Sequence, residues 1–181
     1  MKKIAAMLLL VLLAAGCAKT PAQTAKTEQM PQDFAICFAW WYNLEQKNSM
    51  DTATGKLQKD LLADGTASAE FQPDEELLQQ LYELVSRDGF LSISREMTTQ
   101  ELATDGTAAG VSPNTCYEIT VTINGKQTVV RGDQTAAAYT DTDADAACFV
   151  AVTDELQQIV RELPEWKALP ESDGAYQYEK G

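Results

Sequence analysis

Residues 34–42, FAICFAWWY, decide the kind of fold that this chain can form. Large apolar side chains stand at every second position, and a period of two is the period of a β-strand. One face of the strand carries Phe34, Ile36, Phe38, Trp40 and Tyr42. The other face carries Ala35, Cys37, Ala39 and Trp41. A strand with one strongly apolar face needs a second layer over it, and amphipathic helices supply such a layer.

Two segments further along the chain have the apolar spacing of such helices. Pro73 and the three acidic residues after it are typical of a helix start, and Gly89 is well placed to end this helix. The second helix is expected over residues 146–163, where apolar residues form one stripe and Pro164 stops it. Trp166 follows directly, and we expect it to fold back and cap the core.

Alternation and turn signals predict four further strands. They cover residues 56–61, 67–71, 116–123 and 126–131. The last two are joined by Asn124-Gly125, the strongest short-range signal for a hairpin. Residues 92–113 are rich in Thr, Ala, Gly and Ser and receive no assignment.

The order of strands and helices predicts the fold class. It is α+β, an antiparallel sheet with two helices packed on one face, because this arrangement buries every apolar stripe. We expect a single domain over residues 34–170, followed by a C-terminal tail over residues 171–181.

The start of the chain has the composition of a lipoprotein signal peptide, over residues 1–16. Two lysines precede an apolar run of 12 residues, which is shorter than the roughly 20 that a membrane-spanning helix needs. The small residues that follow lead directly into Cys17, and LLAAGC resembles the lipobox of bacterial lipoproteins. The resemblance implies cleavage before Cys17, a lipid on its sulfur and acylation of the new N-terminus. The other interpretation is a soluble secreted protein with a chance cysteine at this place.

A lipid on Cys17 determines where the protein works. The membrane becomes its first partner, and the location is the cell envelope, on the extracytoplasmic side. Residues 17–33 then form the lipidated cysteine and a flexible linker, since residues 18–33 are polar and contain two prolines.

Composition excludes several classes of function. The chain has 14 basic and 27 acidic residues and a net charge of −13, so nucleic acid is not expected as a partner. It contains no histidine, which removes Ser–His–Asp and Cys–His catalysis and histidine metal ligands. No cofactor and no metal site are predicted, and carboxylates are the most plentiful groups left for catalysis.

The cysteines other than Cys17 are odd in number. We predict a disulfide between Cys37 and Cys116, with Cys148 as a buried thiol; the alternative is that all three are reduced. Three cysteines without a CxxC spacing or a fourth ligand do not indicate a metal site.

Three short motifs have both a functional and a structural interpretation. The run DTDAD at 141–145 starts like a calcium loop but has Ala146 and Val152 where the loop needs glycine and glutamate, so we expect one aspartate to cap the closing helix instead. The RGD tripeptide at 131–133 is expected to form a turn after the hairpin. Trp41 points away from the core face of its strand and is a candidate partner surface, unless the linker or the tail covers it.

Several of these segments together resemble a family. The runs DTATGKL, QPDEELLQQLYELV, NGK and PEWKALP are similar to those of small bacterial lipoproteins whose domain has no assigned function. The resemblance covers most of residues 34–170 and implies the architecture and the envelope location, but it implies no active site.

Two functions remain open from the sequence. The first is a lipid-anchored envelope lipoprotein with a non-catalytic domain that binds an envelope protein or a small ligand. The alternative is an anchored enzyme that acts on cell-wall or polysaccharide substrates with carboxylates. An exposed Trp41 would favour the first, and a pocket holding two carboxylates with raised pKa values would favour the second.

Overall fold

The computed structural model describes residues 29–42, 46–87, 89–103 and 113–174. The signal peptide and Cys17 lie outside the described residues, and so does the end of the predicted tail.

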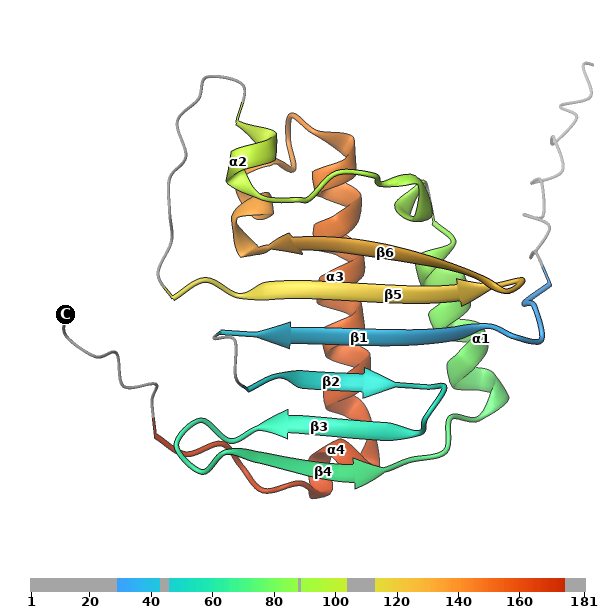
Figure 1. Ribbon diagram of the computed structural model, residues 1–181, viewed down its shortest axis with the longest axis vertical. Helices are drawn as coiled ribbons and strands as arrows, with labels where there is room; N and C mark the ends of the chain where they lie inside the picture. Colours follow the sequence, from blue (N-terminus) through green and yellow to red (C-terminus); the bar gives the residue numbers. More distant parts are fainter. Residues whose placement is uncertain (1–28, 43–45, 88, 104–112, 175–181) are drawn as a thin grey trace, which may run out of the picture.

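Six strands form one antiparallel sheet in the order β4-β3-β2-β1-β5-β6 (Figure 1). The strands are β1 (Ala35–Trp41), β2 (Asn48–Asp51), β3 (Lys56–Asp60), β4 (Thr66–Glu70), β5 (Cys116–Ile123) and β6 (Lys126–Asp133). The strand predicted from FAICFAWWY is β1, which lies inside the sheet and pairs with β2 on one side and β5 on the other. The polar strand β2 has only four residues and was not predicted, because Asn-Ser-Met-Asp has too few apolar positions to show a period.

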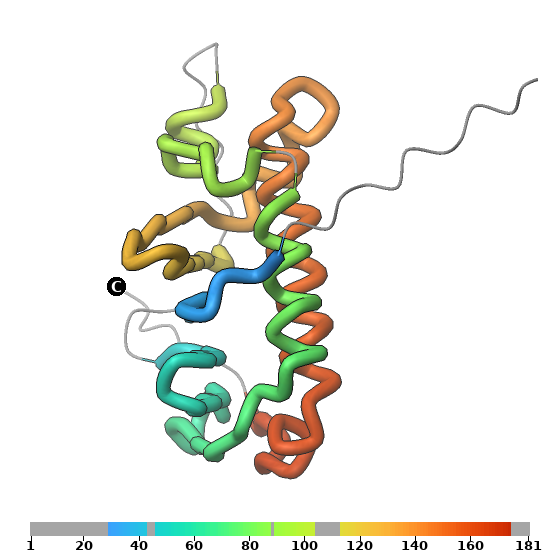
Figure 2. Tube along the Cα trace, turned by 90° about the vertical axis from the view of Figure 1, so that its right-hand side faces the viewer, coloured from blue at the N-terminus to red at the C-terminus, as the bar shows by residue number. Residues whose placement is uncertain are grey.

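The helices complete the α+β fold. They are α1 (Glu75–Val85), α2 (Thr99–Leu102), α3 (Ala144–Glu162) and α4 (Pro164–Ala168), with 3₁₀ turns η1 (Phe90–Ser92) and η2 (Gln134–Tyr139). Figure 2 shows the sheet edge-on with α1 and α3 side by side over the same face, and α4 at the foot of this helical layer. The predicted fold class, an antiparallel sheet with two helices packed on one face, is confirmed.

The ends of α1 differ by a few residues from the prediction. Asp74 is the N-cap, with its carboxylate 2.8 Å from the amide of Leu77, so the expected proline lies one residue before the cap and not inside the helix. The helix ends at Val85, four residues before Gly89. The Arg87 amide donates to the Leu84 carbonyl three residues back, which is the hydrogen-bond pattern of a 3₁₀ turn at a helix end.

The side chains of an aspartate and a proline set the two ends of the second long helix, α3. Asp143 caps α3, and the break at Pro164 sends the chain into α4. There Trp166 returns to the sheet and is 6% exposed, with its ring 5.4 Å from that of Trp40. The expectation that Trp166 caps the core is confirmed.

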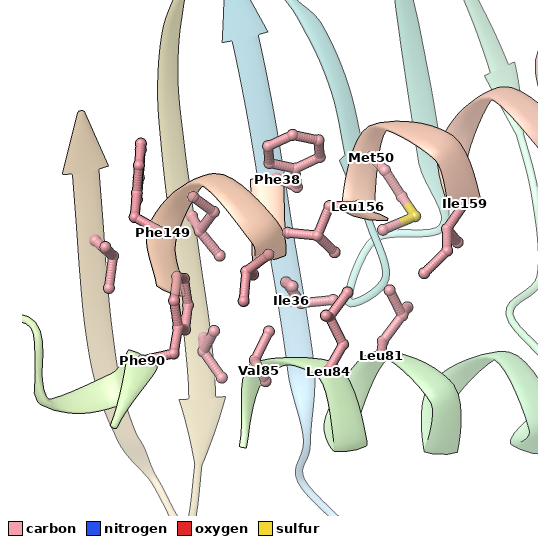
Figure 3. Close-up of a cluster of buried hydrophobic side chains, with 14 of the residues drawn as sticks. Ile36, Phe38, Met50, Leu81, Leu84, Val85, Phe90, Phe149, Leu156 and Ile159 are labelled. Carbon is pink, nitrogen blue, oxygen red and sulfur yellow. The ribbon is translucent and has the colours of Figure 1, made fainter. Parts of the chain in front are cut away.

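The core lies between the sheet and the helical layer (Figure 3). Its fully buried members from the strands include Ile36, Phe38, Met50 and Ile119. Those from the helical side include Leu81, Leu84, Val85, Phe90, Phe149 and Leu156. The apolar stripes identified in the sequence therefore meet in a single core.

The chain passes very close to itself at Gly132 in β6. Met97 lies along the outer edge of this strand, where its amide donates to the Arg131 carbonyl at 2.9 Å and its carbonyl accepts from the Asp133 amide at 3.0 Å. A Cβ on Gly132 would lie 2.6 Å from both the Met97 Cβ and the Met97 carbonyl oxygen and 2.7 Å from the Phe149 ring. Only glycine fits here, because backbone and ring atoms leave no room for a methyl group.

Gly132→Ala should therefore destabilise the protein by at least about 2 kcal/mol, the cost of overpacking a tight core. Urea unfolding followed by far-UV circular dichroism measures this. Val129→Ala, an exposed position on the same strand, should change the free energy of unfolding by less than about 0.5 kcal/mol. Equal effects of the two substitutions would contradict the packing seen at Gly132.

Candidate functional site

The RGD tripeptide is part of β6 and not a turn, so the prediction for it is wrong. The Arg131 side chain pairs with Glu118 of β5 at 2.7 Å, and Gly132 is buried against Met97. The Asp133 carboxylate accepts hydrogen bonds from the Thr135 amide and the Asn114 side chain, both at 2.8 Å. These contacts hold the three residues in the sheet, where they cannot be presented as an adhesion loop.

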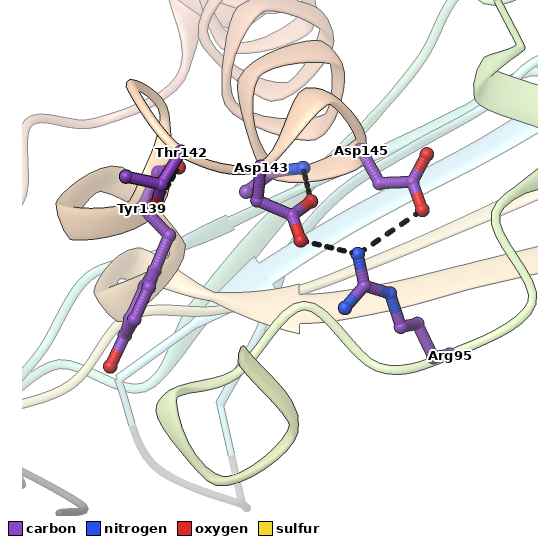
Figure 4. A network of polar contacts seen from close by, with 6 residues as sticks. Arg95, Tyr139, Thr142, Asp143 and Asp145 are labelled. Atoms are coloured by element: carbon purple, nitrogen blue, oxygen red, sulfur yellow. Dashed lines mark hydrogen bonds and ion pairs between the residues drawn. The ribbon is translucent and has the colours of Figure 1, made fainter. Parts of the chain in front are cut away.

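The DTDAD run forms the start of α3 and a charge network with Arg95 (Figure 4). Asp143 accepts from the Ala146 amide at 3.0 Å, which confirms that one aspartate caps the closing helix. The Arg95 guanidinium lies 2.6 Å from the Asp143 carboxylate and 3.3 Å from that of Asp145. The hydrogen bond from Arg95 is the largest cause that lowers the pKa of Asp143, and the bond from the Ala146 amide is the next. In the described residues, no cluster of three or more His, Cys, Asp or Glu could hold a metal ion.

Removing the Asp143 carboxylate should show both of its roles. Asp143→Ala is expected to lose about 1–2 kcal/mol of stability at pH 7, mostly from the lost cap. Because the folded-state pKa is lowered, this stabilisation is present above the unfolded value of about 3.9 and is lost as the pH falls through the folded value. Urea unfolding of both proteins should thus show a constant difference from pH 7 to 5 that shrinks below about pH 4.

Asp143→Asn is the matched control, because asparagine still caps a helix but carries no charge for Arg95. It should lose less than the alanine variant at pH 7. A difference between wild type and Asp143→Ala that stays constant down to pH 2 would count against the ionised carboxylate as the stabilising group.

The predicted disulfide between Cys37 and Cys116 is wrong, because the register of the sheet keeps the two residues apart. Cys37 lies opposite Thr120, whereas Cys116 lies opposite Trp41, four residues further along β1. At about 3.4 Å per residue the two Cα atoms are more than about 13 Å apart, at least twice the distance that a disulfide spans. Both are free thiols, and the structure agrees with the alternative for this pair.

The two thiols are poor nucleophiles at neutral pH. Burial is the main cause that raises the pKa of Cys37, with further contributions from Asp51 and Glu118. Burial followed by Asp133 raises the pKa of Cys116 in the same way. Cys148, expected as a buried thiol, is partly buried against the core.

Trp40 and Trp41 lie on opposite faces of the sheet, as the alternation predicts. Trp40 is 2% exposed under the helical layer, whereas Trp41 is partly exposed on the other face. The helices α1, α3 and α4 all lie on the side of Trp40, so none of them covers Trp41 (Figure 2). The Lys47 ammonium lies 4.1 Å from the centre of the Trp41 ring, in a cation–π contact.

The face around Trp41 is built from small and polar side chains, and we call it the open face. Next to Trp41 in the antiparallel rows stand Cys116 and, one row further, Ala39 between Ser49 and Glu118. Trp41 is the one aromatic side chain that the described strands place on this face. One partly exposed tryptophan with a neighbouring cation among small and polar side chains has the composition of a protein-contact surface.

A cavity of about 430 Å³ lies on the other side of β1, between the end of the sheet and the corner of α3 and α4. We call it the Trp40 cavity. Its lining residues are Trp40, Tyr42, Asn48, Lys59, Asp60, Leu62, Arg161, Trp166, Lys167, Glu171 and Ser172. Lys59 is only 8% exposed there, and its ammonium lies 5.9 Å from the centre of the Trp166 ring.

Sequence reasoning missed this cavity, although one signal for it was present. Lys59 is two residues from Leu57, which is 1% exposed, so the alternation of β3 places a lysine on the apolar face. A charged residue at a core position of a strand is unfavourable unless it has a function. The other lining residues come from segments far apart in the sequence, and no local pattern brings them together.

Two of the described carboxyl groups have a resolved pKa shift, and neither shift is in the direction that a general acid needs. A general acid needs a raised carboxyl pKa, whereas the resolved shifts among the described carboxyls, at Asp33 and Asp143, are both downward. The pKa of Asp33 is lowered because the amides of Gly125 and Asn124 donate to its carboxylate, at 2.6 and 2.9 Å. These bonds fasten the end of the predicted linker to the β5–β6 turn.

Comparison with known proteins adds no function. None of the helices in the described part of the chain is long and apolar enough to span a bilayer. No protein-family model matches the chain, and no curated protein matches it significantly. The resemblance to small bacterial lipoproteins therefore stays a prediction.

Proposed function

We propose that this protein is a lipid-anchored lipoprotein of a bacterial cell envelope, and that its domain binds an envelope protein without catalysing a reaction. The location rests on the lipobox-like LLAAGC that ends at Cys17. The binding function rests on one observation, which is Trp41 on the open face with Lys47 against its ring.

The position of Trp41 suits contact with a partner away from the membrane. The linker enters the fold beside the β5–β6 turn, where the amides of Asn124 and Gly125 hold Asp33. β1 runs from that end toward Trp41 over seven residues, or about 20 Å (Figure 1). An anchor on Cys17 would thus be attached at the end of the sheet opposite to Trp41.

The net charge of the whole chain favours a protein with basic groups as the partner. Tryptophan is among the residues that most often dominate binding energy at protein interfaces, and the small side chains around Trp41 let another surface approach it. The net charge of −13 attracts positively charged surfaces and increases their association rate.

The anchor is tested by Cys17→Ala. The wild-type protein should partition into the detergent phase and carry the mass of the lipid, whereas the variant should be released or remain as the unprocessed precursor. Phase separation and intact-mass spectrometry measure this, with Cys148→Ala as the control that keeps its anchor. Unchanged membrane retention and mass in the Cys17 variant would rule out the proposed anchor.

The partner surface is tested by Trp41→Ala with crosslinking in native membranes and mass spectrometry of the captured proteins. Loss of an interface tryptophan typically costs 2 kcal/mol or more, so capture of the partner should fall by at least about 10-fold. Val129→Ala, which shortens an exposed side chain on the same face, should leave capture unchanged. Equal capture by wild type and Trp41→Ala, or capture of lipid-processing machinery alone, would refute the partner surface.

A further inference from the structure

We propose that the Trp40 cavity is a binding site for a small organic anion, a carboxylate or phosphate group carried on an apolar body. This site is separate from the open face, and the proposal depends neither on the lipid anchor nor on Trp41. Four features of the lining support it. They are the size of the cavity, the weak ion pair of Lys59, the lack of an ion pair at Arg161 within the described residues, and the two tryptophan rings.

The cavity has the size and the walls of a small-molecule site. Its volume of about 430 Å³ falls in the range of roughly 300–1,000 Å³ that is typical of ligand pockets. One wall is the end of the sheet, with Trp40 and Lys59, and the other is the corner of the helical layer, with Arg161 and Trp166. The walls come from separate elements of the two-layer fold, one from the sheet and one from the helical layer.

Lys59 has a largely buried side chain, and its ammonium has only one weak ion pair and a distant ring contact within the described residues. Burial of an ammonium group is costly unless an opposite charge and hydrogen bonds compensate for it. Its ion-pair partner is Glu171, at 3.6 Å, on a side chain that is 90% exposed, and an ion pair with such an exposed carboxylate contributes little. The Lys59 ammonium makes no hydrogen bond to the described residues, so it can donate to a ligand in the cavity.

Arg161 adds a second cation from the last turn of α3. It forms no ion pair within the described part of the chain, whereas its neighbour Lys167 is engaged by Glu162 at 2.6 Å. A cation at a helix C-terminus is favoured by the helix dipole, which explains Arg161 by itself. The dipole does not explain Lys59. With Lys167 the lining holds three cations against two carboxylates, and this excess of positive charge in a chain of net charge −13 favours an anionic ligand.

The tryptophans and Asp60 indicate the apolar body of the ligand and the number of its acidic groups. The rings of Trp40 and Trp166 are 5.4 Å apart and form an apolar wall, and their indole N–H groups donate no hydrogen bond to the described residues. Asp60 and Glu171 are the negative groups of the lining. Asp60 is 3% exposed, accepts from the Leu62 amide through one oxygen and has no partner for the other. Its charge would repel a second anionic group, so we expect an anion with a single acidic group.

The test is isothermal titration of the purified full chain with four probes of similar size: benzoate, phenyl phosphate, benzyl alcohol and benzylamine. We expect saturable binding of benzoate, phenyl phosphate or both, and no binding of the neutral and cationic probes. The tighter of the two anions shows whether the site prefers a carboxylate or a phosphate. Failure of both anions to bind, or equal binding of benzyl alcohol, would overturn the proposal.

Two variants test the residues that carry the argument. Lys59→Met and Arg161→Met should each weaken binding of the preferred anion by at least about 10-fold. Replacing a buried charge by an apolar side chain of similar size is often neutral or stabilising, so the urea midpoint of Lys59→Met should not fall. Lys56→Met is the matched control, since Lys56 is exposed on the same strand but faces the other side of the sheet.

The control variant should keep the wild-type affinity for the anion. Unchanged affinity in both Lys59→Met and Arg161→Met would overturn the assignment of these two groups. Trp41→Ala should also keep the affinity, so a failure of this proposal is distinct from a failure of the partner surface.

Discussion

The structure depends on the burial of the large apolar face of one strand beneath the helical layer. β1 is paired on both edges, by β2 and β5, so its backbone hydrogen bonds are satisfied within the sheet. Ile36 and Phe38 are at most 1% exposed because α3 and α1 cover them. At about 25 cal/mol per Å² of apolar surface, burial of such side chains is the main source of stability, and it fixes which face receives the helices.

This constraint gives the two tryptophans opposite environments. Alternation along β1 sends Trp40 under the helical layer and Trp41 to the open face, although the residues are adjacent. Each side then brings a lysine near an indole ring, Lys59 near Trp166 in the cavity and Lys47 near Trp41 on the surface. The same short stretch thereby contributes Trp40 to the cavity and Trp41 to the open face.

Motifs with familiar functional meanings have structural roles in this chain. Asp143 of DTDAD caps α3, and Asp143 and Asp145 bind Arg95, which ties the segment after η1 to the start of α3. The glycine of RGD is required because Met97 and Phe149 approach β6 too closely for a side chain. In both cases the local sequence suggests a ligand site. The contacts of the folded chain show instead that Asp143 and Asp145 pair with Arg95 and that Gly132 allows close packing.

The sequence by itself determined the elements whose patterns are local. The period of two in β1, the apolar stripes of α1 and α3, the Asn-Gly hairpin and an aspartate cap for α3 are all properties of neighbouring residues, and together they predict the α+β class. Only the tertiary structure decided the short polar strand β2, the four-residue offset of Cys37 and Cys116, and the Trp40 cavity. The physical reason is that strand register and cavity walls depend on contacts between residues far apart in the chain, and such contacts leave no periodic trace in the sequence.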